Sequence, residues 1–232
     1  MTKTVALSPS NQTANTWTDG TNEEQHAVEL AGRVQVILES AGVTVKRADA
    51  VRPFGSDPCR IDYFLGADAL IMLHTNAFDG KTRGMRLFCY QKYAGYGLLA
   101  CENQKLMRSI QLEAELLNMK PDPKTYTDFA QWGELTNADR AGIPAVYVES
   151  IFHDNAEDVA WYYSHLDELA RAIADGILNY FDMTAPEPPD EDDLPVYRIQ
   201  LGAWHDRTLA EKTLQSLQEA GELLRGAIIK EE

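Results

Sequence analysis

Apolar positions in the first 180 residues fall into two alternating patterns. Short apolar runs predict buried strands at residues 4–7, 43–45, 69–73, 84–90 and 145–148. Longer segments with apolar residues at helical spacing predict helices over residues 22–40, 93–118 and 155–180. Strands that alternate with helices are typical of a layered α/β fold with a mostly parallel sheet.

A change of composition marks the end of this body. Residues 184–193 contain three prolines and five acidic residues, which favours an extended linker. We therefore predict a body over 1–183, an acidic Pro-rich linker over 184–195 and a tail over 196–232. The tail has the pattern of a small β-α-β unit, with a strand at its start and a helix after it, and it is too short to bury a stable core alone.

Composition and charge exclude several classes of protein. The 232 residues are 44% hydrophobic and 25% charged, which is ordinary for a globular chain. A formal net charge of −15 argues against a nucleic-acid partner. No apolar run approaches the ~20 residues of a membrane span, and the three cysteines have no metal-ligand spacing. The N-terminus lacks the apolar stretch of a signal peptide, so we expect synthesis in the cytoplasm.

Polar residues that could carry chemistry follow three of the predicted strands: Gln12 after 4–7, His74 after 69–73 and Glu149 after 145–148. Glu23 and Glu24 lie at the start of the first predicted helix. The carboxyl ends of parallel strands meet at one edge of a sheet, where ligands bind. Imidazole and carboxylate groups suit a zinc ion, and a further free carboxylate can act as a general base. From spacing alone, an α/β binding or regulatory domain whose polar strand ends hold no metal is the favoured interpretation.

Three segments resemble a known enzyme family. The sequence His74-Thr75-Asn76-Ala77, followed by Gly84, is similar to a Ser-x-His-x-Asn-Ala...Gly segment of zinc-dependent N-acetylmuramoyl-L-alanine amidases of the Amidase_3 type. Residues 144–155 resemble that family's Pro-x-x-Leu-x-Glu-x-Gly-Phe-x-x-Asn segment, and the helix opened by Asn22-Glu23-Glu24 resembles its zinc-binding helix. The resemblance extends over roughly residues 3–182.

This resemblance implies a three-layer αβα sandwich that cleaves peptidoglycan between N-acetylmuramic acid and L-alanine by zinc-activated water. Carried over by position, Glu24 and His74 become zinc ligands, with Glu23 as the alternative to Glu24. Glu149 becomes the catalytic carboxylate, and Asn76 a contact for the substrate.

One departure from the family concerns the first zinc ligand. The family has a His after its first strand, whereas this chain reads Ser8-Pro9-Ser10-Asn11-Gln12 and places Gln12 there, as in a divergent Ser-Pro-Ser-x-Gln branch. A neutral amide is a poor zinc ligand, so the third ligand is either Gln12 or His153. The alternative function is a non-catalytic peptidoglycan-binding protein with a degenerate amidase site.

The tail and one loop carry further expectations. Residues 197–204 resemble the first strand of a SPOR peptidoglycan-binding domain, of which only the first half is recognised. Two interpretations stay open: either two tails pair into a homodimer, or the second half of the domain is lost or truncated. The apparent lack of a leader fits a phage or prophage endolysin, or a sporulation protein acting at the cell wall. We expect the loop 121–132 to face the substrate, and Trp17, Phe78 and Trp132 are candidates to line a groove.

Overall fold

The computed structural model describes residues 2–48, 61–95, 99–117 and 126–186. The chain divides into a unit of residues 1–187 and a unit of residues 188–232. The predicted tail and most of the linker lie outside the described residues. The account below therefore concerns the first unit.

The centre of this unit is a six-stranded sheet with the order β2-β1-β3-β6-β4-β5. Its strands are β1 (Thr4–Pro9), β2 (Thr44–Arg47), β3 (Ala69–Asn76), β4 (Arg86–Tyr90), β5 (Tyr126–Ala130) and β6 (Ala145–Phe152). Strands β2, β1, β3 and β6 are parallel, β4 runs antiparallel to β6, and β5 is parallel to β4. The mostly parallel sheet predicted from the sequence is confirmed.

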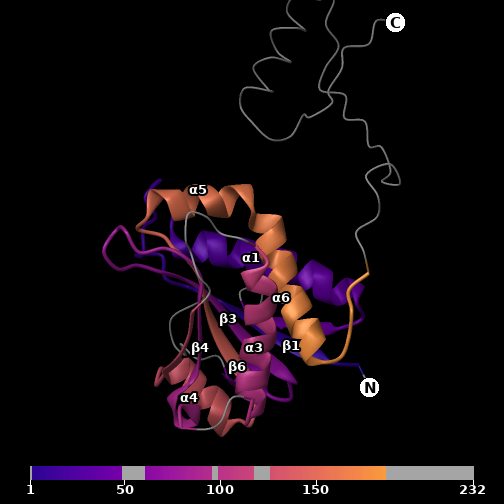
Figure 1. Cartoon of the computed structure of the whole chain (residues 1–232). Coiled ribbons are helices and arrows are strands. Elements are labelled where there is room, and N and C mark those ends of the chain that lie inside the picture. The colour runs from indigo at the N-terminus through magenta and orange to yellow at the C-terminus, as the bar shows by residue number, and fades with distance from the viewer. Residues whose placement is uncertain (1, 49–60, 96–98, 118–125, 187–232) are drawn as a thin grey trace, which may run out of the picture. The chain divides into compact units, whose positions relative to one another are not determined.

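Helices cover both faces of the sheet (Figure 1). The larger core contains residues from α1 (Glu23–Ser40), α3 (Glu102–Glu115), α5 (Ala156–Ser164) and α6 (Leu166–Tyr180). The smaller core, on the opposite face, contains residues from α2 (Ile61–Phe64) and α4 (Gly133–Arg140). A short 3-10 helix, η1 (Gln91–Tyr93), follows β4. None of the helices in the described part of the chain is long and apolar enough to span a bilayer.

Three elements differ from the sequence prediction. The helix expected over 93–118 begins only at Glu102. The helix expected over 155–180 is interrupted at His165, whose backbone leaves the helical region while its ring stacks on Trp161. Apolar periodicity continues across this break, so the pattern could not reveal it. The region 121–132, expected to be a loop, contains the edge strand β5.

Strand register determines which side chains can meet at the carboxyl end of the sheet. Alternate residues of a strand face opposite sides, and both Met72 on β3 and Tyr147 on β6 belong to the smaller core. His74 and Glu149 therefore face the same side, and the two residues are register partners. A third polar residue, Glu23, comes from α1. Asn22 caps this helix and thereby places Glu23 at its first position.

Candidate active site

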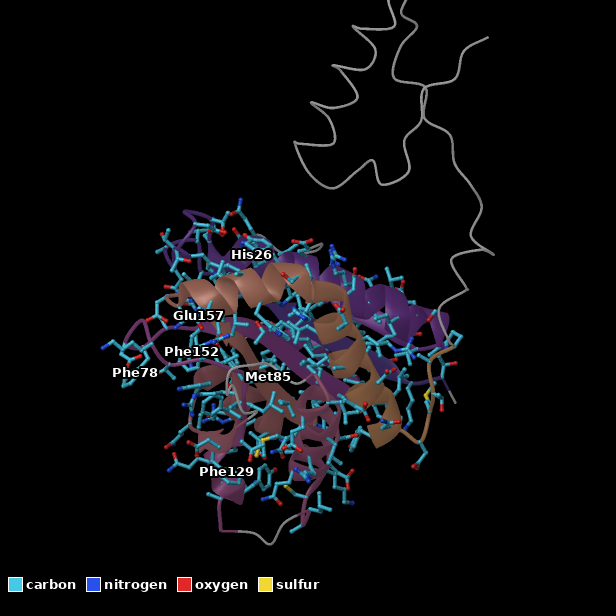
Figure 2. The ribbon with its side chains drawn as sticks, turned by 45° about the horizontal axis from the view of Figure 1, so that its top comes forward. His26, Phe78, Met85, Phe129, Phe152 and Glu157 are labelled. Atoms are coloured by element: carbon cyan, nitrogen blue, oxygen red, sulfur yellow. The ribbon has the colours of Figure 1, made fainter. Side chains whose placement is uncertain are left out.

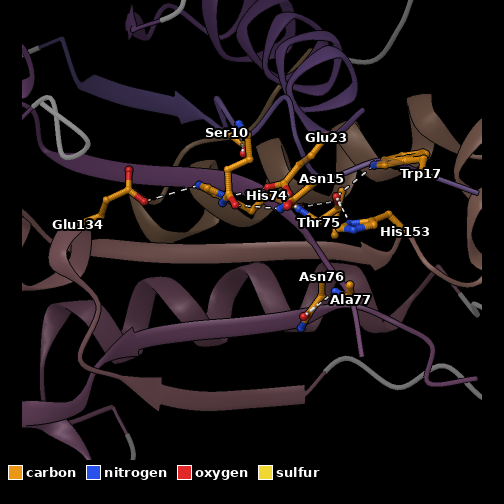
Figure 3. A network of polar contacts seen from close by, with 12 residues as sticks. Ser10, Asn15, Trp17, Glu23, His74, Thr75, Asn76, Ala77, Glu134 and His153 are labelled. Carbon is orange, nitrogen blue, oxygen red and sulfur yellow. Dashed lines mark hydrogen bonds and ion pairs between the residues drawn. The ribbon is translucent and has the colours of Figure 1, made fainter. Parts of the chain in front are cut away.

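A buried pair of one carboxylate and one imidazole forms the centre of the site (Figure 3). The Oε1 atom of Glu23 lies 2.8 Å from Nδ1 of His74. Glu23 is fully buried although its charge favours water, and its Oε2 accepts a 2.6 Å hydrogen bond from Asn15 Nδ2. Burial opposes ionisation, but the hydrogen bond and positive charge of His74 outweigh it and lower the pKa of Glu23.

The glutamate beside His74 is Glu23, the alternative kept open in the sequence analysis, and not the preferred Glu24. Consecutive residues of an α-helix point about 100° apart. When Glu23 faces the ends of β1 and β3, Glu24 must therefore face elsewhere, and it is partly exposed. The spacing argument from the sequence did not weigh the capping of α1, which fixes where the helix starts.

Gln12 lies beside this pair, in the segment after β1 and directly before a turn at residues 13–14. Its Nε2 is 3.4 Å from His74 Nδ1, and its Oε1 accepts a 2.8 Å hydrogen bond from the Asn15 amide that also binds Glu23. Asn15 thus ties the turn to α1. The sequence analysis missed Asn15, because a loop asparagine has no periodic signal that distinguishes it from any other turn residue.

The other sides of the His74 ring are also occupied. The Tyr147 ring stacks on it with 4.2 Å between ring centroids, and Glu134 Oε2 lies 3.6 Å from His74 Nε2. Burial disfavours the imidazolium, but Glu134 and Glu23 together raise the pKa of His74 to about 9. Neither Glu134 nor Tyr147 was predicted as a site residue. Glu134 lies on α4, a helix without a clear signal in the apolar pattern. Tyr147 lies within the apolar run of β6, which indicates only a buried strand.

Glu149 is a buried carboxyl group on β6, and one of its two oxygens lacks a hydrogen-bond partner among the described residues. It is 8% exposed, and its Oε2 makes no hydrogen bond with any residue in the described part of the chain. Burial raises the pKa of Glu149 to about 7, against the opposing attraction of His74. A carboxyl group with a pKa near neutrality can both take up and release a proton under physiological conditions.

His153 lies in a second polar cluster. Its Nδ1 is 2.9 Å from Thr75 Oγ1, which also accepts a 3.3 Å hydrogen bond from Trp17 Nε1 (Figure 3). Thr75 follows His74 in the strand and therefore points to the opposite face. Asn76, expected to contact substrate, uses its Oδ1 to accept a 2.8 Å hydrogen bond from the backbone of Ala77.

The three candidate groove aromatics lie in different environments. Trp17 is 2% exposed and belongs to the larger core, so it does not line an open groove. Phe78 is 78% exposed and projects from the edge of the unit (Figure 2). Trp132 is 40% exposed and packs against Tyr147, so it is the one that adjoins the His74 ring stack.

The donor set around His74 can be compared with what a zinc ion requires. No group of three or more His, Cys, Asp or Glu side chains that could hold a metal is present in the described ranges. The site offers one imidazole and one carboxylate, with the Gln12 amide as a weaker neighbour. The carboxylate near the other ring nitrogen matches the outer partner that zinc-binding histidines usually have. The residues therefore fit a zinc ion that is held weakly.

Comparison with known proteins identifies the family. The family model Amidase_3, described as N-acetylmuramoyl-L-alanine amidase, matches residues 9–179. The chain belongs to this family. A search of curated proteins found no match.

Solved structures of amidases share the fold of this family member. AmiC2 of Nostoc punctiforme is 19% identical with a TM-score of 0.64, covering 78% of this chain and 97% of its own. The CwlD amidase of Clostridioides difficile is 18% identical with a TM-score of 0.62, covering 78% and 98%. The catalytic domain of CwlV from Bacillus (Paenibacillus) polymyxa is 16% identical with a TM-score of 0.64, covering 78% and 99%.

The family membership confirms the enzyme class predicted from the sequence, an N-acetylmuramoyl-L-alanine amidase with peptidoglycan as its substrate. The αβα architecture of the described unit agrees with this family's fold. The alternative of a non-catalytic binding protein is not favoured.

Proposed function

We propose that this amidase cleaves the bond between N-acetylmuramic acid and L-alanine with Glu149 as general base and general acid. The observation that carries the proposal is the position of the Glu149 carboxyl group. It is buried, it has an oxygen without a hydrogen-bond partner among the described residues, and it is the register partner of His74. Burying such a group costs several kcal/mol, which favours a chemical role over a structural one.

We further propose that Glu23 and His74 hold a zinc ion, with Gln12 as the third and weakest protein contact. Both side chains are buried, and Glu23 Oε1 lies 2.8 Å from His74 Nδ1. The two side chains therefore lose little conformational entropy when they bind a metal ion. A zinc ion there would supply Lewis acidity that polarises the amide carbonyl. Because an amide oxygen carries no charge, we expect weaker zinc affinity than a site with a histidine in place of Gln12 would have.

The chain's own groups account for the movement of protons. The Glu149 carboxylate accepts a proton from the attacking water as the new C–O bond forms. It then returns that proton to the nitrogen of L-alanine as the C–N bond breaks, and leaves a lactyl carboxylate and a free amine. A pKa near 7 suits both steps, since the group is neither too weak a base nor too weak an acid.

Three matched glutamate variants test the proposal. Glu149→Gln should keep the fold and the zinc content but lower the rate of release of new amino groups from peptidoglycan by at least ~100-fold. Glu23→Gln should lower zinc content as well as activity. Glu24→Gln is the control, and both properties should stay within about twofold of wild type. Glu149→Gln with near wild-type activity would contradict the general-base role.

The region beyond residue 186 carries a separate proposal. From its sequence, the strand-like segment 197–204 resembles the start of a SPOR peptidoglycan-binding domain. We propose that residues 196–232 bind glycan strands, in an endolysin or sporulation enzyme that acts at the cell wall. Deletion of residues 184–232 should weaken binding to purified cell walls in a sedimentation assay and leave hydrolysis of soluble peptidoglycan fragments unchanged. Unchanged wall binding would contradict this role of the tail.

A further inference from the structure

The junction between β5 and α4 reaches the His74 ring from two directions. Trp132 is the residue before α4, and its ring packs on Tyr147, with 4.6 Å between centroids. Tyr147 in turn stacks on the face of His74. Two residues further along, in the first turn of α4, Glu134 places its Oε2 3.6 Å from His74 Nε2.

The Nε2 atom of His74 pairs with the Glu134 carboxylate at 3.6 Å, which is longer than a hydrogen bond. This nitrogen is buried and makes no hydrogen bond to any residue in the described ranges, so the Glu134 carboxylate, at 3.6 Å, is the group best placed to serve it. A buried ring N–H without an acceptor is unfavourable, and a shift of a few tenths of an ångström at Glu134 would bring the two atoms within hydrogen-bond distance. The Glu134 side chain is 15% exposed, so water does not fully screen the interaction.

The two ring nitrogens of His74 have different neighbours. Nδ1 faces Glu23 and Gln12, where the proposed metal contacts converge, whereas Nε2 faces Glu134. An acceptor at Nε2 keeps the proton on that nitrogen and leaves the lone pair of Nδ1 free to bind a cation. Glu149 does not fix the His74 ring in this way, because its free oxygen makes no hydrogen bond with His74.

We propose that Glu134 is a positioning residue, which accepts the Nε2 proton of His74 and so orients Nδ1 toward Glu23. This inference rests on the proposed metal-binding role of His74. Glu134 lies on the Nε2 side of the ring and acts through the imidazole. The segment 132–134 thus fixes the ring at its edge through Glu134 and at its face through Trp132 and Tyr147.

Zinc affinity of the full-length protein, measured by competition with a chromophoric chelator, provides the first test. Glu134→Ala should weaken zinc binding 10- to 100-fold, as loss of an outer carboxylate does in other zinc sites. Glu134→Gln should recover most of the affinity, since its amide oxygen still accepts the Nε2 proton. Glu168→Ala is the matched control, because Glu168 is also an acidic residue in the first turn of a helix but is exposed and distant from the site.

A second readout does not depend on zinc. In zinc-free protein labelled with ¹⁵N-histidine, the Nε2 proton of His74, assigned with His74→Gln, should give a slowly exchanging resonance that Glu134→Ala abolishes and Glu134→Gln retains. If wild-type protein binds no zinc, the proposed metal site fails and this resonance alone decides the role of Glu134. Unchanged zinc affinity together with an unchanged resonance in Glu134→Ala would overturn the inference.

Discussion

The buried carboxyl group of Glu149 should make the stability of the zinc-free enzyme depend on pH in a way that one substitution removes. Burial raises its pKa from the usual 4.5 to about 7 in the folded protein. The folded state therefore binds this proton more tightly than the unfolded state does. Its contribution to stability is fully present below pH 4.5 and decreases as the pH rises toward and through 7.

The size of this effect follows from the two pKa values. A difference of about 2.5 corresponds to a loss of about 3 kcal/mol at pH well above 7, of which about 2–3 kcal/mol should develop between pH 5 and pH 8. In Glu149→Gln the side chain stays neutral, so this loss should be absent. His74, whose pKa is about 9, remains protonated over most of this range in the metal-free protein and affects both proteins similarly.

Urea unfolding at pH 5 and at pH 8, followed by tryptophan fluorescence after chelator treatment, measures the effect. The free energy of unfolding of Glu149→Gln minus that of wild type should be about 2–3 kcal/mol larger at pH 8 than at pH 5, because only wild type loses stability over this range. The comparison between two proteins at each pH cancels the contributions of groups that both share. If this difference changes by less than about 0.5 kcal/mol between the two pH values, Glu149 is not held in a desolvated position and the reasoning for its role fails.

Two further predictions concern the third ligand and the packing of the helices. Gln12→His should raise zinc affinity at least ~10-fold, because imidazole is a better zinc ligand than an amide. His153→Ala should change zinc affinity less than about twofold. The reverse result, measured by chelator competition, would make His153 the ligand. Gly176→Ala should lower the free energy of unfolding by about 1–3 kcal/mol, because the added methyl would lie 2.5 Å from the Ile110 Cα atom. Gly95→Ala, where nothing lies within 4 Å, should be nearly neutral in the same urea titration.

Much of the fold could be predicted because each central strand carries a strong local signal. Both β3 and β6 begin with an apolar run, and the first residue of each strand was predicted correctly. The polar residues that follow hid the last three residues of β3 and the last four of β6. The edge strand β5 was missed because its sequence, Tyr-Thr-Asp-Phe-Ala, has a charge at its centre and no continuous apolar run. A strand at the edge is stabilised by pairing on one side only, and its pairing with β4 cannot be deduced from local pattern.

Only the site residues that follow an apolar strand could be predicted from the sequence pattern. His74 and Glu149 were found because both follow buried strands, and register brings them together. Glu134 could not be found in this way, because its place beside His74 depends on how β5 and α4 return across the sheet. The choice between Glu23 and Glu24 depended on the first residue of α1, and pattern arguments locate helix ends only within a few residues.

Strand alternation also explains why the two histidines nearest to the strand ends cannot be equivalent. His74 and Thr75 are neighbours in β3, so their side chains project to opposite faces, and Thr75 carries the contact to His153. In the described part of the chain, the two polar clusters are linked where the Thr75 backbone N–H approaches Glu23 Oε1 at 3.4 Å. A change at His153 therefore reaches the Glu23–His74 pair through Thr75, whereas a change at Gln12 acts on His74 directly. This asymmetry is why Gln12→His, and not a substitution of His153, is the variant expected to alter metal binding.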